Sequence, residues 1–215
     1  MGAMTHVLVL GAGGQIPRWV IEMLKNSRDV ELTLFLRRTQ SLKQDAPKNA
    51  KVVQGDVLKA EQLNQALVGQ DLVYANLTGE DLDVQARAIV AAMKTANMKR
   101  LSFVTSLGIY DEIPGVFGEW NRREIGAYLP PFRRAADAIE ASGLDYTLLR
   151  PAWLTDHDEI DYETTEKGEP FKGTEVSRKS VADLIVKIIQ APSRHSKGNI
   201  GVDKPGTEGD KPVFF

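Results

Sequence analysis

Short apolar runs alternate with amphipathic stretches along almost the whole chain. Runs typical of strands buried on both faces occur at 7–10, 32–36, 51–54, 71–75, 101–105 and 146–149. Stretches with apolar residues at helical spacing lie between or after them, at 19–24, 62–67, 83–95, 132–141 and 178–189. Parallel neighbouring strands need crossover helices, so the pattern predicts an α/β fold of the Rossmann type, a doubly wound, mostly parallel sheet with helices on both faces.

Three segments depart from this alternation. Residues 111–131 are rich in Gly, Pro and aromatic residues, and we expect a long loop with a short helix that forms a lid over the site. Residues 156–172 form a polar excursion, and 200–202 predict a last short strand before an irregular tail. We expect one domain over 1–215, in which about 151–215 form a small lobe on the substrate side.

Composition and charge exclude several classes of function. The 215 residues carry a formal net charge of −2 with both signs interspersed, which argues against nucleic acid and membrane surfaces as partners. Because the chain has no cysteine, disulfides, thiol nucleophiles and thiolate metal sites are excluded. His6, His157 and His195 lack metal-ligand spacing, so no metal site is expected. No run reaches the length of a membrane span, and we expect a soluble, cytoplasmic protein.

A glycine-rich turn follows the first apolar run. The residues Gly11-Ala12-Gly13-Gly14-Gln15-Ile16-Pro17 lie between the first predicted strand and the first predicted helix. The free amides and the positive dipole end of a first helical turn bind a pyrophosphate where no side chain blocks its approach. A glycine turn alone is weak evidence, but here it opens a β-α-β unit of the expected length, which indicates a dinucleotide ligand.

The second predicted strand ends at Arg37 and Arg38, where the adenosine ribose of a bound dinucleotide would lie. Guanidinium groups suit the 2′-phosphate of NADP, whereas an acidic residue there would suit the ribose hydroxyls of NAD. We therefore expect NADP (NADPH) as the preferred cofactor, with NAD as the second possibility; the alternative is that both arginines solvate a strand end.

Four segments resemble the atypical short-chain dehydrogenase/reductases of the NmrA-like, NAD(P)-binding group. They are the glycine turn, Gly55-Asp56-Val57, the stretch from Phe103 to Gly108, and the string Ser142-Gly143-Leu144-Asp145-Tyr146-Thr147-Leu148-Leu149-Arg150-Pro151. The resemblance covers nearly the whole chain. The last string is its most specific part, because chance agreement over that length is improbable.

The resemblance implies a cofactor site spread over several strand ends. Amides around Gly11, Gly14, Gln15 and Ile16 would hold the pyrophosphate, and Arg37 would face the 2′-phosphate. Asp56 would bond the adenine amino group beside Val57, or would serve as an ordinary turn residue. Asn76, Leu77 and Thr78 would pass beneath the nicotinamide ribose. The candidate cofactor residues are Gly11, Gly13, Gly14, Gln15, Ile16, Arg37, Arg38, Asp56, Val57, Asn76, Leu77, Thr78 and Thr105.

Two departures from the family pattern affect the chemistry. Pro17 stands where a third small residue is usual, and its ring would alter the pyrophosphate geometry. These reductases also use a tyrosine and a lysine four residues later as proton donor and partner. Here Leu129 and Arg133 hold those two positions. Ser106 remains as the expected carbonyl-binding serine.

Candidate catalytic residues are accordingly Ser106, Tyr110, Tyr128 and Arg133, with one of the two tyrosines as proton donor. Trp153, Trp120 and Phe117 would line the substrate side, or belong to the core. The main hypothesis is an NAD(P)H-dependent oxidoreductase acting on a small carbonyl, quinone or flavin-like acceptor. The alternative is a non-catalytic NAD(P)-sensing regulator with a protein partner; a third reading is a scaffold in which Pro17 has abolished cofactor binding.

Overall fold

The computed structural model describes residues 3–42 and 45–215 and contains an eight-stranded sheet in the order β3-β2-β1-β4-β5-β6-β10-β8. All neighbours are parallel except β10 and β8. The strands are β1 (Thr5–Leu10), β2 (Val30–Leu36), β3 (Ala50–Gln54), β4 (Leu72–Ala75), β5 (Arg100–Val104), β6 (Asp145–Pro151), β8 (Glu163–Glu166) and β10 (Gly198–Asp203).

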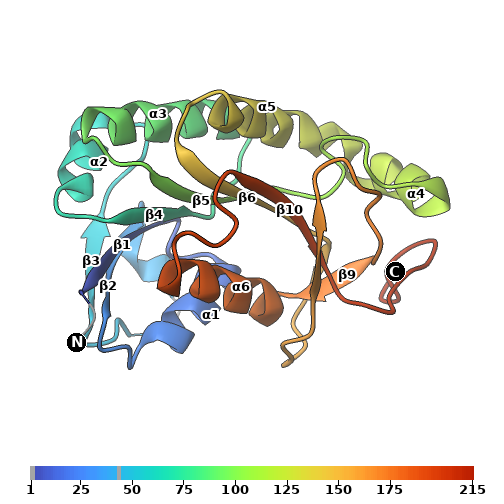
Figure 1. The fold of residues 1–215 in the computed structure, drawn as a ribbon, viewed down its shortest axis with the longest axis horizontal. Coiled ribbons are helices and arrows are strands. Elements are labelled where there is room, and N and C mark those ends of the chain that lie inside the picture. The colour runs from blue at the N-terminus through green and yellow to red at the C-terminus, as the bar shows by residue number, and fades with distance from the viewer. Residues whose placement is uncertain (1–2, 43–44) are drawn as a thin grey trace.

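Helices cover both faces of this sheet (Figure 1). They are α1 (Gln15–Leu24), α2 (Ala60–Leu67), α3 (Leu82–Thr95), α4 (Gly115–Ile125), α5 (Leu129–Glu140) and α6 (Arg178–Gln190). One layer holds α1 against α6, and the other holds α3 between α2 and α5. The order of strands reverses direction between β1 and β4, as in doubly wound sheets. The predicted Rossmann-type fold is confirmed.

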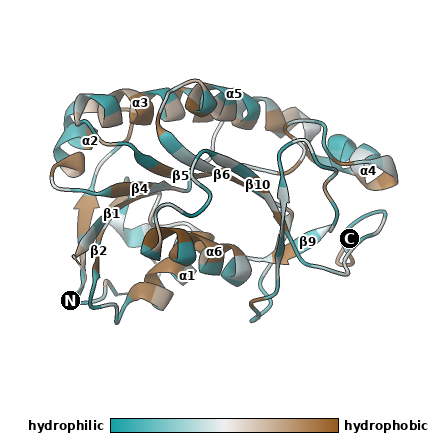
Figure 2. Ribbon diagram, viewed as in Figure 1, coloured by the Kyte–Doolittle hydropathy of each residue, from teal (hydrophilic) through white to brown (hydrophobic). Residues whose placement is uncertain are grey.

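Burial on both faces explains the uninterrupted apolar runs. In β1, Val7 and Val9 pack in the cluster beneath α1 and α6, whereas Leu8 and Leu10 pack in the cluster beneath α2, α3 and α5. Hydrophobic residues accordingly follow the strands and the sheet-facing sides of the helices (Figure 2). A strand with one polar face could not occupy the centre of such a sheet, because that face would be buried without partners.

The segment 111–131 is more regular than its sequence predicts. It contains α4, a three-turn helix, and the short 3₁₀ helix Gly126–Tyr128, and α5 begins at Leu129 rather than at Phe132. Pro130 and Pro131 lie in the first turn of α5, where a missing amide removes no intrahelical hydrogen bond. The prediction of a long loop with a short helix is therefore wrong, because helices occupy more of this segment than expected.

The C-terminal third of the chain joins the main layers in part. Helix α6 packs on α1, and β10 pairs with β6 in the central sheet. The polar excursion contains the edge strand β8, and β7 (Trp153–Thr155) and β9 (Glu175–Ser177) form a separate two-stranded sheet. The sequence pattern does not predict these strands, because β8 is polar and the other two span only three residues each.

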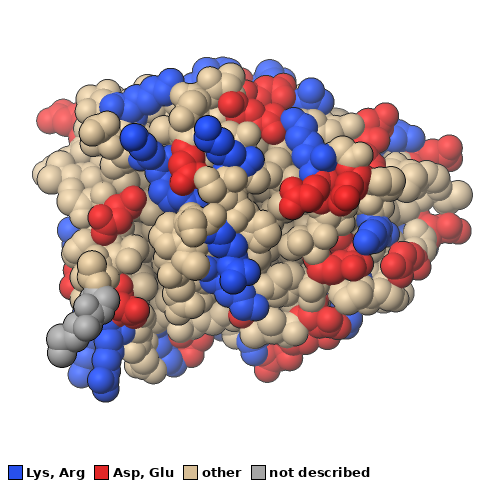
Figure 3. Space-filling view, in the orientation of Figure 1, with Lys and Arg blue, Asp and Glu red and all other residues tan. Residues whose placement is uncertain are grey.

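Charged side chains of both signs are interspersed over the face drawn in Figure 3. Within residues 3–42 and 45–215, no helix is both long enough and apolar enough to cross a membrane. Over the same ranges no cluster of three histidine, aspartate or glutamate side chains is arranged to hold a metal ion.

Asp203, at the end of β10, is a fully buried carboxyl group. Its Oδ2 accepts a hydrogen bond from the Gly173 amide at 2.8 Å, and its Oδ1 has no partner among the described residues. Burial raises the pKa of Asp203 to about 6, while the Gly173 amide opposes that rise. The folded protein therefore binds this proton more tightly than the unfolded chain does.

The Asp203→Asn variant tests this burial. Because the carboxyl group is penalised once it ionises, its contribution should make wild-type stability fall as the pH rises from about 4 to about 6. Asparagine keeps an acceptor for the Gly173 amide and does not ionise. We expect the variant to gain about 1–3 kcal/mol relative to wild type between pH 4 and pH 7.5, measured by urea unfolding. Parallel pH profiles for the two proteins would contradict the assignment.

Candidate functional site

A cavity of about 600 Å³ opens at the carboxyl ends of β1, β2 and β4. It lies at the point where the strand order reverses, which is where doubly wound sheets bind their ligands. Its walls come from the glycine turn, the end of β2 with the short 3₁₀ helix Thr39–Ser41, the turn after β3 and the loop after β4. The lining residues include Gly11, Gly13, Gly14, Phe35, Arg37, Arg38, Ser41, Asp56, Val57, Asn76, Leu77, Thr78, Asp81 and Gln85.

Two glycines of the turn are required because neighbouring loops approach their Cα atoms closely. Gly11 has φ of +79°, and a Cβ on it would lie 2.1 Å from the carbonyl oxygen of Asn76. A Cβ on Gly13 would lie 2.4 Å from the Oγ of Ser41. No other residue type fits at Gly11, because both the backbone angle and the space exclude a side chain. The turn is thus held against the loops after β2 and β4, which leaves a bare backbone surface facing the cavity.

The hydrogen bonds of the turn decide which amides it offers. The Gly11 amide donates to the Phe35 carbonyl at 3.1 Å, and the Gly14 amide donates to the Gly11 carbonyl at 3.0 Å. These two amides thus already have acceptors within the fold. Gln15 and Ile16 are the first residues of α1, and amides of a first turn have no intrahelical acceptor. Of the amides expected to hold the pyrophosphate, those two remain available.

Pro17 fits this arrangement. It occupies the first turn of α1, where its missing amide hydrogen removes no intrahelical bond, and its ring is buried. Pro17 lines neither this cavity nor the second cavity described below. The ring is buried beside Gly14 and takes no part in the described lining of the first cavity.

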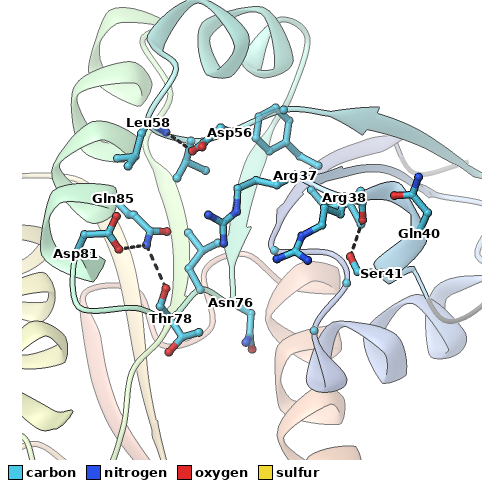
Figure 4. Close-up of a pocket in the computed structure, with 18 residues that line it drawn as sticks. Arg37, Arg38, Gln40, Ser41, Asp56, Leu58, Asn76, Thr78, Asp81 and Gln85 are labelled. Atoms are coloured by element: carbon cyan, nitrogen blue, oxygen red, sulfur yellow. Dashed lines mark hydrogen bonds between the residues drawn. The ribbon is translucent and has the colours of Figure 1, made fainter.

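Arg37 and Arg38 bring positive charge to the cavity. Figure 4 shows both side chains directed into it from the end of β2. Neither guanidinium forms an ion pair or hydrogen bond with another described residue, whereas their carbonyl groups accept bonds from Gln54 at 3.1 Å and Ser41 at 2.6 Å. The backbone is therefore fixed and the two cationic groups are available to an anion.

Asp56 makes the contact expected of a turn residue. Its Oδ1 accepts from the Leu58 amide at 2.9 Å (Figure 4). Its own amide donates to Oε1 of Gln62 at 2.9 Å. The same carboxylate lines the cavity beside Val57. One carboxylate oxygen is used within the turn, and Oδ2 has no hydrogen-bond partner among the described residues, so the residue can serve both expected roles.

The loop after β4 links the first cavity to a second one of about 390 Å³. Asn76, Leu77 and Thr78 line both. Gln85 holds this loop, because its Nε2 donates to the Thr78 carbonyl at 3.1 Å and to Asp81 at 2.8 Å (Figure 4). The buried Tyr74 hydroxyl lies 3.2 Å from the Asn76 Oδ1 and donates to it.

The second cavity is walled mainly by apolar groups. Its described lining is Ile16, Asn76, Leu77, Thr78, Val104, Thr105, Ser106, Leu107, Ile125, Phe132, Pro151, Ala152, Trp153, Leu154 and Arg178. The Thr105 hydroxyl donates to the Leu149 carbonyl at 3.0 Å, so it ties β5 to β6. The Ser106 hydroxyl lies 3.2 Å from the adjacent Leu107 carbonyl. That weak local contact leaves the hydroxyl able to turn towards a ligand.

The structure does not bring the other expected catalytic residues to this cavity. The Tyr110 hydroxyl accepts from Asn199 at 2.8 Å, and Arg133 stacks over the Tyr110 ring at 4.8 Å. Burial, and then the Glu140 carboxylate, raises the pKa of Tyr110 far above its ordinary value, opposite to the shift that a proton donor needs. Tyr128 is 69% exposed. Neither tyrosine nor Arg133 lines either of the two cavities.

The aromatic residues divide between wall and core. Trp153 lines the second cavity, and its indole nitrogen donates to Asn121 at 2.9 Å. Trp120 packs behind it with ring centroids 4.9 Å apart, and Phe117 packs on Trp120 at 6.1 Å. Only Trp153 of these three faces the cavity.

Sequence reasoning missed Ser41, Gln85 and Arg178. Ser41 and Gln85 act through backbone contacts that no spacing in the sequence reveals. Arg178 follows the helix cap Ser177 and looks like an ordinary first-turn residue, but the β7–β9 sheet carries it to the cavity.

A glycine turn at the switch point, first-turn amides, and two arginines without a partner among the described residues define a Rossmann-type dinucleotide-binding protein. The chain matches the NAD(P)H-binding protein family over residues 11–192. It therefore belongs to that family and is an atypical short-chain dehydrogenase/reductase.

Solved structures agree with this assignment. A Rossmann-fold NAD(P)-binding family protein from Shigella flexneri is 56% identical, with a TM-score of 0.86 over 99% of this chain and 100% of the other. A short-chain dehydrogenase/reductase from Veillonella parvula, solved in complex with NADP, is 28% identical with a TM-score of 0.87 over 98% and 99% of the two chains. Among curated proteins, an NAD(P)H azoreductase from Xenophilus azovorans is 23% identical over 90% of this chain and 65% of its own.

Replacing Gly11 by alanine tests the close approach of the glycine turn to Asn76. Gly69 is the matched control, because its φ is +76° but a Cβ there would meet nothing within 4 Å. We expect Gly69→Ala to destabilise the protein by about 1–2 kcal/mol through the backbone alone. Gly11→Ala should destabilise it by about 2–5 kcal/mol and weaken NADPH binding. Urea unfolding and a fluorescence titration measure both effects; equal destabilisation would argue against the contact.

Proposed function

We propose that the protein is an NADPH-dependent reductase whose acceptor is a small conjugated molecule of the quinone or flavin type. The observation that carries the proposal is the pair of cavities joined by Asn76, Leu77 and Thr78. One cavity has the bare glycine turn and two arginines, and the other is apolar with Ser106 at the end of β5. A dinucleotide in the first would extend past the shared loop to an acceptor in the second.

Residues that line the first cavity, together with Gln15 and Ile16 at the adjacent start of α1, fit NADP. Gly11 and Gly13 keep the turn free of side chains, and the first-turn amides of Gln15 and Ile16 suit the pyrophosphate. Arg37, with Arg38 beside it, suits the 2′-phosphate. Asp56 and Val57 suit the adenine edge and face, and Asn76 to Thr78 suit the nicotinamide ribose.

The second cavity supports an acceptor that needs no dedicated proton donor. NADPH supplies two electrons and one proton as hydride when bound, and water supplies the second proton that a quinone needs to become a hydroquinone. Ser106 would donate a hydrogen bond to the acceptor oxygen, where negative charge develops. Trp153, Phe132 and Leu107 exclude water from the ring face. No tyrosine, histidine, lysine or carboxylate is among the described lining residues.

The relative named an NAD(P)H azoreductase supports a reductase and is consistent with an acceptor other than a simple carbonyl. A simple aldehyde or ketone would call for a proton donor at the carbonyl oxygen, and Tyr110 and Tyr128 lie elsewhere. We therefore favour quinone and flavin-like acceptors over small carbonyls.

A second candidate function, a non-catalytic NAD(P) sensor, draws on the same observation. A cavity without a proton donor also suits a protein that binds the dinucleotide and turns nothing over. The two functions differ in whether bound NADPH is oxidised when a quinone is added.

The Arg37→Ala variant tests the 2′-phosphate assignment. Loss of a charge-assisted contact should raise the Kd for NADPH about 10–100-fold and change that for NADH less than about threefold. Arg28→Ala is the control, because Arg28 is an exposed arginine that lines neither cavity. Titrations followed by nicotinamide fluorescence provide the constants. Equal losses for the two cofactors would reject the assignment.

Acceptor turnover tests the reductase itself. With menadione as acceptor we expect NADPH oxidation, and with benzaldehyde none above background. Ser106→Ala should lower kcat for menadione by about tenfold or more, whereas Tyr110→Phe and Tyr128→Phe should leave it within about twofold. Absorbance at the reduced nicotinamide band reports the rate. Tight NADPH binding without oxidation by menadione or by a flavin would instead favour the sensor.

A further inference from the structure

Arg178 is the sole charged side chain among the described residues that line the second cavity. It is the first residue of α6, directly after the cap residue Ser177, whose hydroxyl accepts from the Ser180 amide. The other described lining side chains are apolar or neutral, with Trp153, Phe132, Ile125, Leu107 and Leu154 forming the apolar part. A cation in such a cavity is costly to desolvate unless an anion lies beside it, so the strength of its existing pairing matters.

The hydrogen-bond partners of Arg178 hold its side chain in place, but they compensate its positive charge only weakly. Its Nη1 lies 3.5 Å from the Leu154 carbonyl, on a strand that forms the cavity wall, and 3.0 Å from Oδ1 of Asp156. The Arg178 side chain is 20% exposed, whereas that of Asp156 is 82% exposed. An ion pair with so exposed a carboxylate is weak, so a ligand anion can replace it.

The guanidinium also has donors to spare. Its contacts with described residues use Nη1 alone, while Nε and Nη2 have no hydrogen-bond partner there. A planar fork of two such groups matches a carboxylate in bidentate geometry. Lys179, the next residue, pairs with Asp158 and stacks over Trp19, so it does not compete for this place.

We propose that Arg178 binds a carboxylate group of the acceptor, and hence that the acceptor is an anionic conjugated molecule. The aromatic and aliphatic walls take the ring system, Ser106 takes the reacting oxygen, and Arg178 takes the carboxylate at the β7 side. This inference rests on the proposed function in so far as it treats the bound molecule as the acceptor of the reductase. The anion site itself depends only on the cavity and its charge.

A matched pair of probes tests the charge preference. Anthraquinone-2-carboxylate and anthraquinone-2-carboxamide share the ring system and differ in charge. Calorimetric titration of the protein saturated with NADP⁺ gives both Kd values without turnover. We expect the carboxylate to bind about tenfold tighter than the amide, with the difference shrinking as salt is raised.

Three variants and one control separate recognition from a structural role. Arg178→Gln should abolish the preference for the carboxylate, and Arg178→Lys should keep part of it, because a single ammonium lacks the fork. Asp156→Asn should tighten carboxylate binding about two- to fivefold, since it removes the competing anion. A merely structural ion pair predicts no such gain. Lys179→Gln, a charge loss one residue away, should leave the preference unchanged.

Several outcomes would overturn the anion site. They are equal affinities of wild type for the two probes, equal weakening of both by Arg178→Gln, and a loss of NADP⁺ affinity as large as the loss for the carboxylate. The last result would assign Arg178 to the dinucleotide.

NADPH oxidation distinguishes this inference from the proposed function. Reduction of both quinones with the same KM supports a reductase and overturns the anion site. Arg178-dependent binding of the carboxylate without any NADPH oxidation supports the anion site and overturns the reductase. If NADP⁺ does not bind, the same probe comparison is made on the protein without cofactor, where dependence on Arg178 still decides.

Discussion

The contact between Gly11 and the backbone of Asn76 is the constraint on which the site depends. It lies at the ends of the parallel neighbours β1 and β4, where the chain leaves β1 towards one edge of the sheet and leaves β4 towards the other. The Asn76 amide donates to the Leu10 carbonyl at 3.0 Å, and the Gly11 amide donates to the Phe35 carbonyl, so the ends of three strands are tied together at this point. Only a residue without a side chain permits this approach, which brings the glycine turn and the loop after β4 side by side in the lining of the first cavity.

A second set of buried contacts sets the path of the chain after β5. The Glu112 carboxylate accepts from the Gly108 and Tyr110 amides, each at 3.0 Å, and from the buried Arg150 at 2.7 Å. Breaking such a pair would leave an uncompensated charge, so the loop conformation is strongly determined. This clamp carries Tyr110 towards Asn199 and away from the cavity. Ser106, before the clamp, stays at the strand end.

The chemistry of the second cavity follows from the separation of Ser106, which lines it, from Tyr110, which does not. A proton donor at the acceptor would require an ionisable side chain in the second cavity, and the fold places the available tyrosines elsewhere. Over the described residues, the second cavity offers hydroxyl groups, one amide, apolar walls and one guanidinium. That combination suits the conjugated acceptor of the proposed function, whose reduction would not depend on a protein acid.

The sequence by itself determined the parallel part of the sheet, the glycine turn and the arginines at the end of β2. Apolar runs reveal strands buried on both faces, and Gly11, Gly13 and Arg37 lie just after the ends of such strands, where position along the chain implies position in space. The tertiary structure alone decided the extent of α4, the polar edge strand β8 and the places of Tyr110 and Arg178. These depend on contacts between residues far apart in the chain, such as Arg150 with Glu112 and Arg178 with Leu154, and local pattern carries no information about such contacts.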